Sequence, residues 1–135
     1  MLHAPGELLL LTTRGRTSGQ PRTVPLQSFR DGDDLVVVAA NNGQAINPGW
    51  YYNLKATPWA QVELMGRVLQ VCAEELPADE AAVFWRRLAQ IAPAYARTQQ
   101  QTPRAIPLMR LVPMALAREQ PTPGAVARQI EKAEV

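Results

Sequence analysis

The sequence predicts one small α+β domain, built as an antiparallel β-barrel of about six strands with helices after the third and fifth strands. Short apolar or alternating stretches recur along the chain, and Gly, Pro and Asp-Gly turn signals separate them. Two segments with helical features interrupt this series. A chain of 135 residues can bury about two-thirds of its unfolded surface, so we expect one domain over residues 1–135 with its core at about 8–113.

The first three predicted strands form a meander. Residues 7–14 (ELLLLTTR) are apolar and end in β-branched threonines, which is typical of a strand, and the following GRTSGQ is a glycine-bounded turn. Residues 21–29 (PRTVPLQSF) contain prolines, which favour an edge strand or a bulge. The Asp-Gly pair within residues 30–34 predicts a tight hairpin into residues 35–40 (LVVVAA), which have the composition of a fully buried strand.

A short helix and a second hairpin are predicted next. Asn47 followed by Pro48 is a typical pair of N-cap and first-turn residues, so we expect a helix over about 48–56. Residues 60–76 alternate between apolar and polar on both sides of Gly66, which predicts two strands joined by a bend near this glycine.

Residues 77–101 have helical character, and we expect Pro93 to break them into two helices. The apolar stripe at helical spacing is Ala81, Phe84, Leu88 and Ile91 or, alternatively, Trp85, Leu88 and Ala92. Residues 105–114 form the last predicted strand, and the C-terminal tail at 115–135 is a candidate short helix.

The residue inventory excludes several kinds of chemistry. Cys72 is the only cysteine, which excludes an internal disulfide and a multi-cysteine zinc site. The only histidine is His3, far along the chain from either serine, Ser18 or Ser28, which argues against Ser-His-Asp catalysis. We expect no metal site, and an enzyme with this composition would rely on a cofactor for the difficult chemistry.

Neither a membrane segment nor secretion is indicated. The aliphatic runs, such as LLLL at 8–11, are far shorter than the roughly 20 residues that a membrane span needs. The start MLHAPGE lacks the basic region of a signal peptide and leads almost directly into the first predicted strand. We therefore expect a soluble cytoplasmic protein.

Arginines cluster around the segment RGRTSGQPRTVPL (14–26). Residues 1–30 hold four arginines against one acidic residue, namely Arg14, Arg16, Arg22 and Arg30 against Glu7. Guanidinium groups and backbone amides on a glycine-containing turn are suited to phosphate or carboxylate; the alternative is a solvated hairpin with ordinary surface arginines. The helix start at 47–49 adds a positive dipole end, and Gly43 predicts a positive φ in a loop that a flat ring can approach.

Three motifs stand in order along the chain: TTRGRTSGQPRTVPL, VVVAANNGQAINPGWYYNLKATP and IAPAYARTQQQTPRAIPL. With these motifs the chain resembles the deazaflavin-dependent nitroreductase family, split-barrel oxidoreductases that bind coenzyme F420. The resemblance implies an FMN-binding split-barrel-like fold, F420 as the cofactor and Tyr95 as the catalytic residue that donates the proton, with solvent as the alternative proton source. The cofactor contacts that it implies are Arg16, Thr17, Ser18, Arg22, Thr23, Val24, Pro25, Leu26, Gln27, Val38, Ala39, Ala40, Asn41, Gly49, Trp50, Tyr51, Tyr52, Asn53 and Tyr95.

Several positions depart from the family's pattern. Thr17 stands where many members carry lysine, and Ala40 stands where some nitroreducing members carry serine. Ala92 and Thr98 replace further tyrosines of some members, and Gln27 replaces an aromatic residue. The cofactor site therefore matches the family better than the acceptor site does, and we do not expect reduction of nitroimidazoles.

The resemblance implies a two-electron reductase in which reduced F420 passes a hydride from C5 to an electrophilic acceptor such as a quinone, an activated alkene or a nitro compound. Two alternatives are an FMN-binding split-barrel reductase and a non-catalytic carrier of an apolar ligand such as a fatty acid. A net charge of only +2 argues against a nucleic-acid partner. The expected partner is a small-molecule electron acceptor, and the expected assembly is a monomer or homodimer.

Overall fold

The computed structural model describes residues 6–114, so His3 and the tail at 115–135 lie outside the described residues. Residues 6–114 form six strands, three α-helices and one short 3₁₀ helix. In chain order the elements are β1 (Glu7–Arg14), β2 (Pro21–Asp31), β3 (Asp34–Val38), η1 (Asn41–Gly43), α1 (Gly49–Ala56), β4 (Trp59–Leu64), β5 (Arg67–Glu75), α2 (Ala78–Ile91), α3 (Pro93–Gln101) and β6 (Leu108–Pro113).

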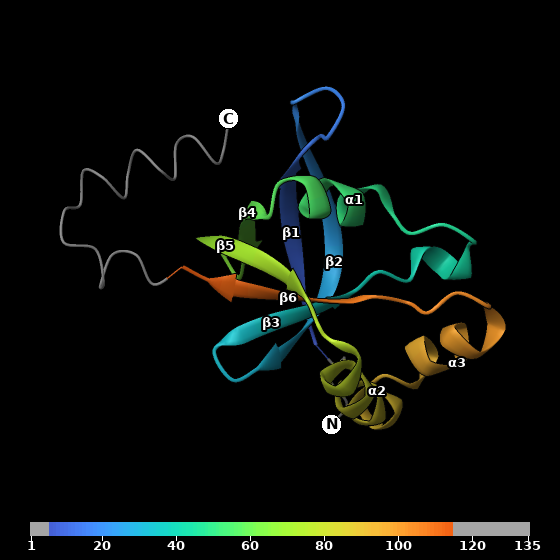
Figure 1. Cartoon of the computed structure of the whole chain (residues 1–135). Coiled ribbons are helices and arrows are strands. Elements are labelled where there is room, and N and C mark those ends of the chain that lie inside the picture. Colours follow the sequence, from blue (N-terminus) through green and yellow to red (C-terminus); the bar gives the residue numbers. More distant parts are fainter. Residues whose placement is uncertain (1–5, 115–135) are drawn as a thin grey trace.

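The six strands close into an antiparallel barrel in the order β1-β2-β3-β6-β5-β4 (Figure 1). Closure comes from β1 and β4, which pair residues 10–12 with residues 61–63. Helices follow the third and the fifth strand. The predicted six-stranded barrel of the α+β class is therefore confirmed.

The turns and the proline-containing strand also follow the sequence signals. The β2–β3 hairpin turns at Gly32 (φ 66°), and the β4–β5 hairpin turns at Met65 and Gly66 (φ 52° and 78°). β2 pairs with β1 over residues 21–28 but with β3 only over residues 28–31. Both of its prolines thus lie where the strand has a single neighbour, as expected for an edge.

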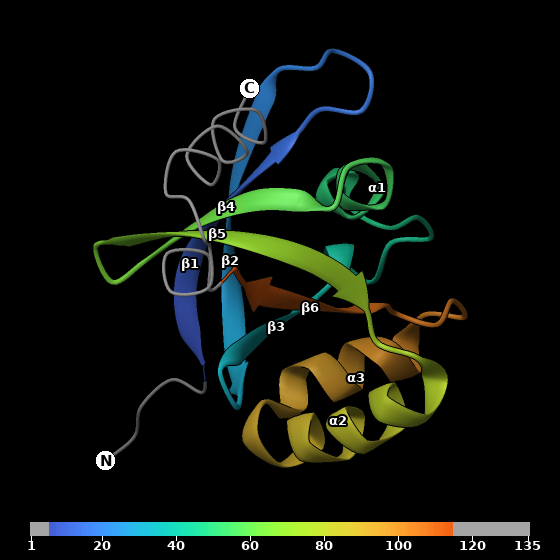
Figure 2. The ribbon, with the colours of Figure 1, turned by 60° about the vertical axis from the view of Figure 1, so that its left-hand side comes forward.

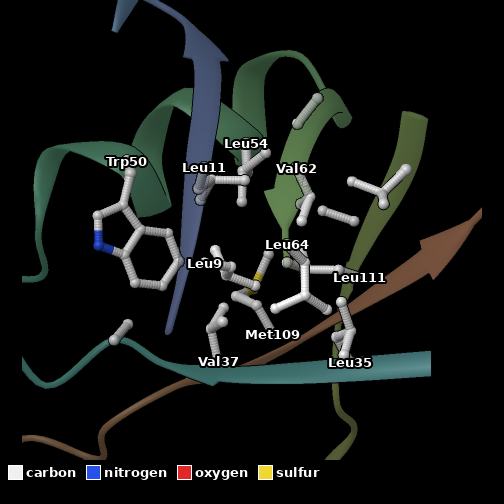
Figure 3. Packing of buried hydrophobic residues seen from close by; sticks show 14 residues of the cluster. Leu9, Leu11, Leu35, Val37, Trp50, Leu54, Val62, Leu64, Met109 and Leu111 are labelled. Atoms are coloured by element: carbon white, nitrogen blue, oxygen red, sulfur yellow. The ribbon is translucent and has the colours of Figure 1, made fainter. Parts of the chain in front are cut away.

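Apolar side chains from all six strands fill the barrel interior, together with Trp50 and Leu54 from α1 (Figure 3). β3 is buried on both faces: Leu35 and Val37 belong to the interior cluster, whereas Val36 and Val38 belong to a second cluster outside the barrel. α1 thereby anchors against the barrel core, and its first residues are held in place at the barrel's end.

The second cluster lies between the outer face of the barrel and the helix pair α2 and α3 (Figure 2). Phe84 and Leu88 of α2, with Ala92, are its buried helical residues. Ala81 and Trp85 pack against the same cluster, so the observed stripe combines the two predicted ones. Only Ile91, which is 38% exposed, was predicted wrongly. Pro93 begins α3, which confirms the predicted break. None of the helices within residues 6–114 is long and apolar enough to span a membrane.

The start of α1 differs from the prediction by one residue. Pro48, not Asn47, occupies the N-cap position, and no side chain caps the helix there. The Asn47 side chain instead accepts a hydrogen bond from Arg104, a residue 57 positions later in the chain. A tertiary contact has therefore replaced the local capping interaction that the sequence indicated.

Candidate functional site

The turn between β1 and β2, residues 15–20, has a closed and specific shape. The Gly15 amide donates to the Gln20 carbonyl at 2.8 Å, and the Gly19 amide donates to the Gly15 carbonyl at 2.8 Å. The Ser18 hydroxyl oxygen accepts from the Gln20 amide at 3.1 Å and from Arg22 Nη2 at 3.3 Å. A Cβ at position 15 would lie 2.8 Å from the Ser18 hydroxyl, so only glycine fits this close approach.

Arg16 and Asn53 tie this turn to α1. Asn53 Oδ1 accepts from the Arg16 amide at 3.1 Å and from Arg16 Nη1 at 2.9 Å. Asn53 Nδ2 in turn donates to Thr13 Oγ1 at 3.0 Å, in a buried contact. Arg16 Nη1 also reaches the Gly49 carbonyl at 3.2 Å, and the guanidinium lies 5.2 Å from the centre of the Tyr52 ring. The guanidinium of Arg16 is thus held against the first turn of α1.

A groove of about 640 Å³ opens between the turn, the start of α1 and the β3–α1 connection. Its lining is Thr13, Gly15, Arg16, Thr17, Ser18, Arg22, Val24, Asn41, Ile46, Asn47, Pro48, Gly49, Trp50 and Asn53. The volume lies within the range of small-molecule sites.

The groove has the electrostatics of an anion site. Within residues 6–114, neither Arg16 nor Arg22 forms an ion pair with a carboxylate; their hydrogen-bond partners are neutral oxygens. No side chain caps the N-terminus of α1, and its first two residues, Gly49 and Trp50, line the groove, so the positive end of the helix dipole lies at this groove. The Tyr51 amide already donates to the Pro48 carbonyl at 3.0 Å. Two guanidinium groups and a helix start on one groove favour an anionic ligand over the alternative of a merely solvated hairpin.

Comparison with known proteins agrees with this chemistry. Residues 2–113 match the F420H(2)-dependent quinone reductase family. An F420H(2)-dependent quinone reductase of Mycobacterium tuberculosis is 40% identical over 113 residues, which is 80% of this chain and 74% of that protein.

The chain belongs to the F420H(2)-dependent quinone reductase family.

Two solved structures are similar to this family member at 33% identity and a TM-score of 0.70. One is an F420-H2 dependent reductase, FDR-A, for which 82% of this chain matches 99% of that chain. The other is described as a domain-swapped dimer and matches 82% of this chain and 84% of that chain. The expected enzyme class, an F420-dependent oxidoreductase, and the expected cofactor, F420, are confirmed by the family.

The predicted cofactor residues of this quinone reductase family member fall into two sets. Those that line the groove are Arg16, Thr17, Ser18, Arg22, Val24, Asn41, Gly49, Trp50 and Asn53. Those that do not line it are Thr23, Pro25, Leu26, Gln27, Val38, Ala39, Ala40, Tyr51, Tyr52 and Tyr95. The groove also contains Thr13, Gly15, Ile46, Asn47 and Pro48, which are not among the predicted cofactor contacts. Of these, Asn47 and Pro48 belong to the helix start at 47–49 that the sequence analysis had placed at the anion site.

Tyr95 and Gln27 lie together outside the groove lining. The Tyr95 hydroxyl donates to Gln27 Oε1 at 3.3 Å, and its ring meets Phe29 edge-on at 5.9 Å between centroids. Burial raises the pKa of Tyr95 above its ordinary value, so the phenol keeps its proton at neutral pH. Tyr95 of α3 packs against the same cluster as Ala40, which lies two residues after the end of β3, so both border the space between the outer face of the barrel and the helix pair.

Tyr51 and Thr23 point to other partners. The Tyr51 hydroxyl donates to Glu75 Oε1 at 2.7 Å, on β5. Burial and this hydrogen bond raise the pKa of Tyr51 to about 12. The Thr23 hydroxyl lies 2.8 Å from the Thr12 hydroxyl in an exposed cross-strand pair. These two side chains therefore have structural contacts of their own.

Proposed function

We propose that this chain is an F420H2-dependent quinone reductase that binds the anionic tail of the cofactor in the groove. The observation that carries the proposal is the pairing of Arg16 and Arg22 with the uncapped start of α1, without a carboxylate partner for either arginine within residues 6–114. The tail of F420 carries a phosphate and glutamate carboxylates, which are the groups that such donors bind. When bound, reduced F420 supplies a hydride from C5 of its deazaflavin ring.

The two arginines have different roles in this proposal. Arg16 is already held by Asn53 and Gly49, so its guanidinium loses little freedom when it binds an anion. Arg22 is exposed and bonds only to the Ser18 hydroxyl among the described residues, so it can turn toward a phosphate. Arg16, which is already held in place, orients the anionic tail of F420, and Arg22 adds a charged hydrogen bond to it.

We further propose that the strand end at residues 38–41 flanks the deazaflavin ring. This segment runs from the outer-face cluster, where Val38 and Ala40 lie near Tyr95, to Asn41 in the groove lining. A ligand with its tail in the groove and its ring along this segment would reach both sets of predicted contacts. Excluding water there would favour hydride transfer over side reactions.

Tyr95 is proposed as the donor to the acceptor oxygen. Its phenol carries a proton at neutral pH, and Gln27 Oε1 accepts a hydrogen bond from it at 3.3 Å. Burial raises the pKa of Tyr95, which keeps the phenol protonated but weakens it as an acid. A phenol is a weak acid at pH 7, so solvent is the competing source of the proton that completes quinone reduction.

We propose quinones, rather than nitro compounds, as the acceptors. Ala92 is buried in the outer-face cluster, and the Thr98 hydroxyl donates to the Ala94 carbonyl at 3.0 Å. Neither position supplies the phenol that some family members carry there, and Ala40 supplies no hydroxyl where some nitroreducing members carry serine. A quinone has two carbonyl oxygens of its own and needs less help from the protein to stabilise the charge that develops.

The test is equilibrium binding of oxidised F420, with FMN, FAD and NADPH titrated in parallel, followed by turnover of F420H2 with a naphthoquinone, a nitroimidazole and an activated alkene. Low-micromolar F420 binding that FMN does not displace, with fastest turnover on the quinone, supports the proposal. Tight FMN binding would overturn the hydride donor. Binding of none of the cofactors would favour a carrier of an apolar ligand.

A further inference from the structure

Arg104 does not line the groove but binds the loop that forms one of its walls. Residues 39–47, called here the 39–47 loop, connect β3 to α1 and contribute Asn41, Ile46 and Asn47 to the groove. Arg104 Nε donates to the Gln44 carbonyl at 2.7 Å, and Arg104 Nη2 donates to the Ala40 carbonyl at 2.6 Å. Arg104 Nη1 donates to the Ala39 carbonyl at 3.2 Å and to Asn47 Oδ1 at 2.5 Å. Four hydrogen bonds from one guanidinium thus span the whole loop.

The 39–47 loop needs such support because its backbone is unusual. Asn41, Asn42 and Gly43 follow one another with φ values of 49°, 54° and 77°. Left-handed conformations cost free energy in residues other than glycine, so neighbouring contacts have to maintain them. Within the loop only three hydrogen bonds do so, from the Gly43 amide to Ala40, from the Gln44 amide to Asn41, and from Asn41 Nδ2 to Ile46.

Arginine is the residue type that this arrangement requires. The four contacts use four of the five N–H groups of a planar guanidinium, and they reach oxygens from four different residues. A lysine ammonium has three donors at one point and cannot span the same oxygens. Within residues 6–114 Arg104 forms no ion pair with a carboxylate, so holding the loop is the role that its contacts describe.

The backbone of Arg104 is itself anchored. Gln99 of α3 donates through Nε2 to the Arg104 carbonyl at 2.8 Å, and its Oε1 accepts from the Ile106 amide at 2.8 Å. Gln99 therefore holds residues 104–106 against α3, and Arg104 holds the 39–47 loop against residues 104–106. The contacts form a continuous connection from α3 to the wall of the groove.

We propose that Arg104, anchored by Gln99, is a positioning residue that presets the 39–47 loop for ligand binding. The proposal rests on the proposed function in one respect, that the ligand is F420. Because Arg104 already orders the 39–47 loop in the folded protein, ligand binding does not lose free energy in ordering it. Arg104 therefore raises the affinity without contacting the ligand.

Arg104→Lys is the main test, with Arg97→Lys as the matched control. Arg97 lies on α3, is exposed, and has no hydrogen bond or ion pair among the described residues. We expect Arg104→Lys to raise the Kd for oxidised F420 about tenfold, as loss of one to two effective hydrogen bonds would. In cofactor-free protein, amide hydrogen exchange should speed up at Gly43 and Gln44 but not in the β-barrel. Arg97→Lys should match the wild type in both measurements.

Gln99→Leu is the second variant, because it loosens the same connection without changing any charge. We expect faster exchange at Gly43 and Gln44 here too, with a smaller rise in Kd. Unchanged exchange and unchanged Kd in Arg104→Lys, or faster exchange spread evenly over the barrel, would overturn the positioning role. The exchange measurement needs no cofactor: if wild-type protein fails to bind F420, the proposed function falls, and exchange still decides the role of Arg104.

Discussion

Asn53 accepts two hydrogen bonds from a single residue, Arg16, one from its backbone amide at 3.1 Å and one from its guanidinium at 2.9 Å. Asn53 is 6% exposed, and its amide nitrogen binds Thr13, which is 2% exposed. One buried side chain of α1 thus determines both the shape of the β1–β2 turn and the direction of its arginine. The groove that we propose as the cofactor site lies where a helix and a hairpin far apart in sequence are joined by this residue.

Asn53→Ala should therefore damage stability and binding together. Three hydrogen bonds are lost and Thr13 Oγ1 is left buried without this partner, so we expect a loss of about 1–3 kcal/mol in the free energy of unfolding. The Kd for F420 should also rise because Arg16 is no longer directed. Urea unfolding and fluorescence titration measure the two effects. Gln90→Ala, at an exposed α2 position, is the control; an Asn53→Ala protein as stable as this control would contradict the prediction.

Arg22→Ala should weaken binding without destabilising the fold. Arg22 is exposed and bonds only to Ser18 in the described part of the chain, so little native structure depends on it. Loss of a charged hydrogen bond to the anionic tail should cost about 1.5–3 kcal/mol of binding free energy. The affinity difference from wild type should shrink as salt is added, because ions screen the charge pair. Isothermal titration of F420 at low and high salt tests this prediction. Arg86→Ala, on the exposed face of α2, is the control. Equal Kd values for wild type and Arg22→Ala would show that Arg22 is not part of the site.

The raised pKa of Tyr51 leads us to expect that the folded protein loses stability in alkaline solution. Burial first, and then the hydrogen bond to Glu75, raise its pKa from 10.0 to about 12 in the folded protein. Its contribution is fully present below the pKa of the unfolded chain, about 10, and is lost as the pH rises toward the folded value, because only the unfolded state releases the proton in that window. Chemical denaturation at about pH 9 and about pH 11.5 should show a smaller fall in unfolding free energy for Tyr51→Phe than for wild type. If the unfolding free energy falls equally in wild type and Tyr51→Phe, Tyr51 does not cause the loss of stability at high pH.

Arg110 on β6 is the centre of an ion-pair network that holds the barrel to α2. Its guanidinium lies 2.6 Å from Glu80, 3.6 Å from Glu74, and 3.8 Å from both Asp31 and Asp34, and its side chain is 18% exposed. Without Arg110, the four carboxylates keep only Arg87, which lies 3.7 Å from Asp31, as a partner among the described residues. Burial raises the pKa of Asp34, and the charges of Asp31, Glu74 and Asp33 raise it further against the opposing effect of Arg110.

Arg110→Met should accordingly lower the free energy of unfolding by about 1–3 kcal/mol at pH 7, less than a fully buried pair because solvent screens part of the network. The difference from wild type should narrow toward about pH 4, where the carboxylates take up protons. Urea unfolding across this pH range measures it. Arg86→Met removes an exposed α2 arginine that has no ion pair among the described residues, and it should show neither effect. If the difference in unfolding free energy between wild type and Arg110→Met does not change with pH, charge is not its cause.

The elements could be predicted from the sequence because their signals are local. The Asp-Gly pair before Asp33 and the Met-Gly pair at 65–66 specify hairpin turns by backbone conformation alone, and Pro93 ends a helix whatever packs against it. Predictions failed where a distant residue intervened. Asn47 did not cap α1 because Arg104 engages its side chain. Ile91 did not join the core because α2 turns Phe84 and Leu88 toward the barrel, followed by Ala92 just after the helix.

By itself, the sequence determined the six-stranded barrel, the two places where helices interrupt it, the glycine-containing arginine turn and the family to which the chain belongs. Only the tertiary structure decided which of the candidate cofactor residues share one groove. On α1 the helical period sends Trp50 and Asn53 toward the barrel and the turn, but Tyr51 toward Glu75 of β5. The tertiary structure also revealed Arg104, because contacts across 57 to 65 positions leave no periodic or local signal in the sequence.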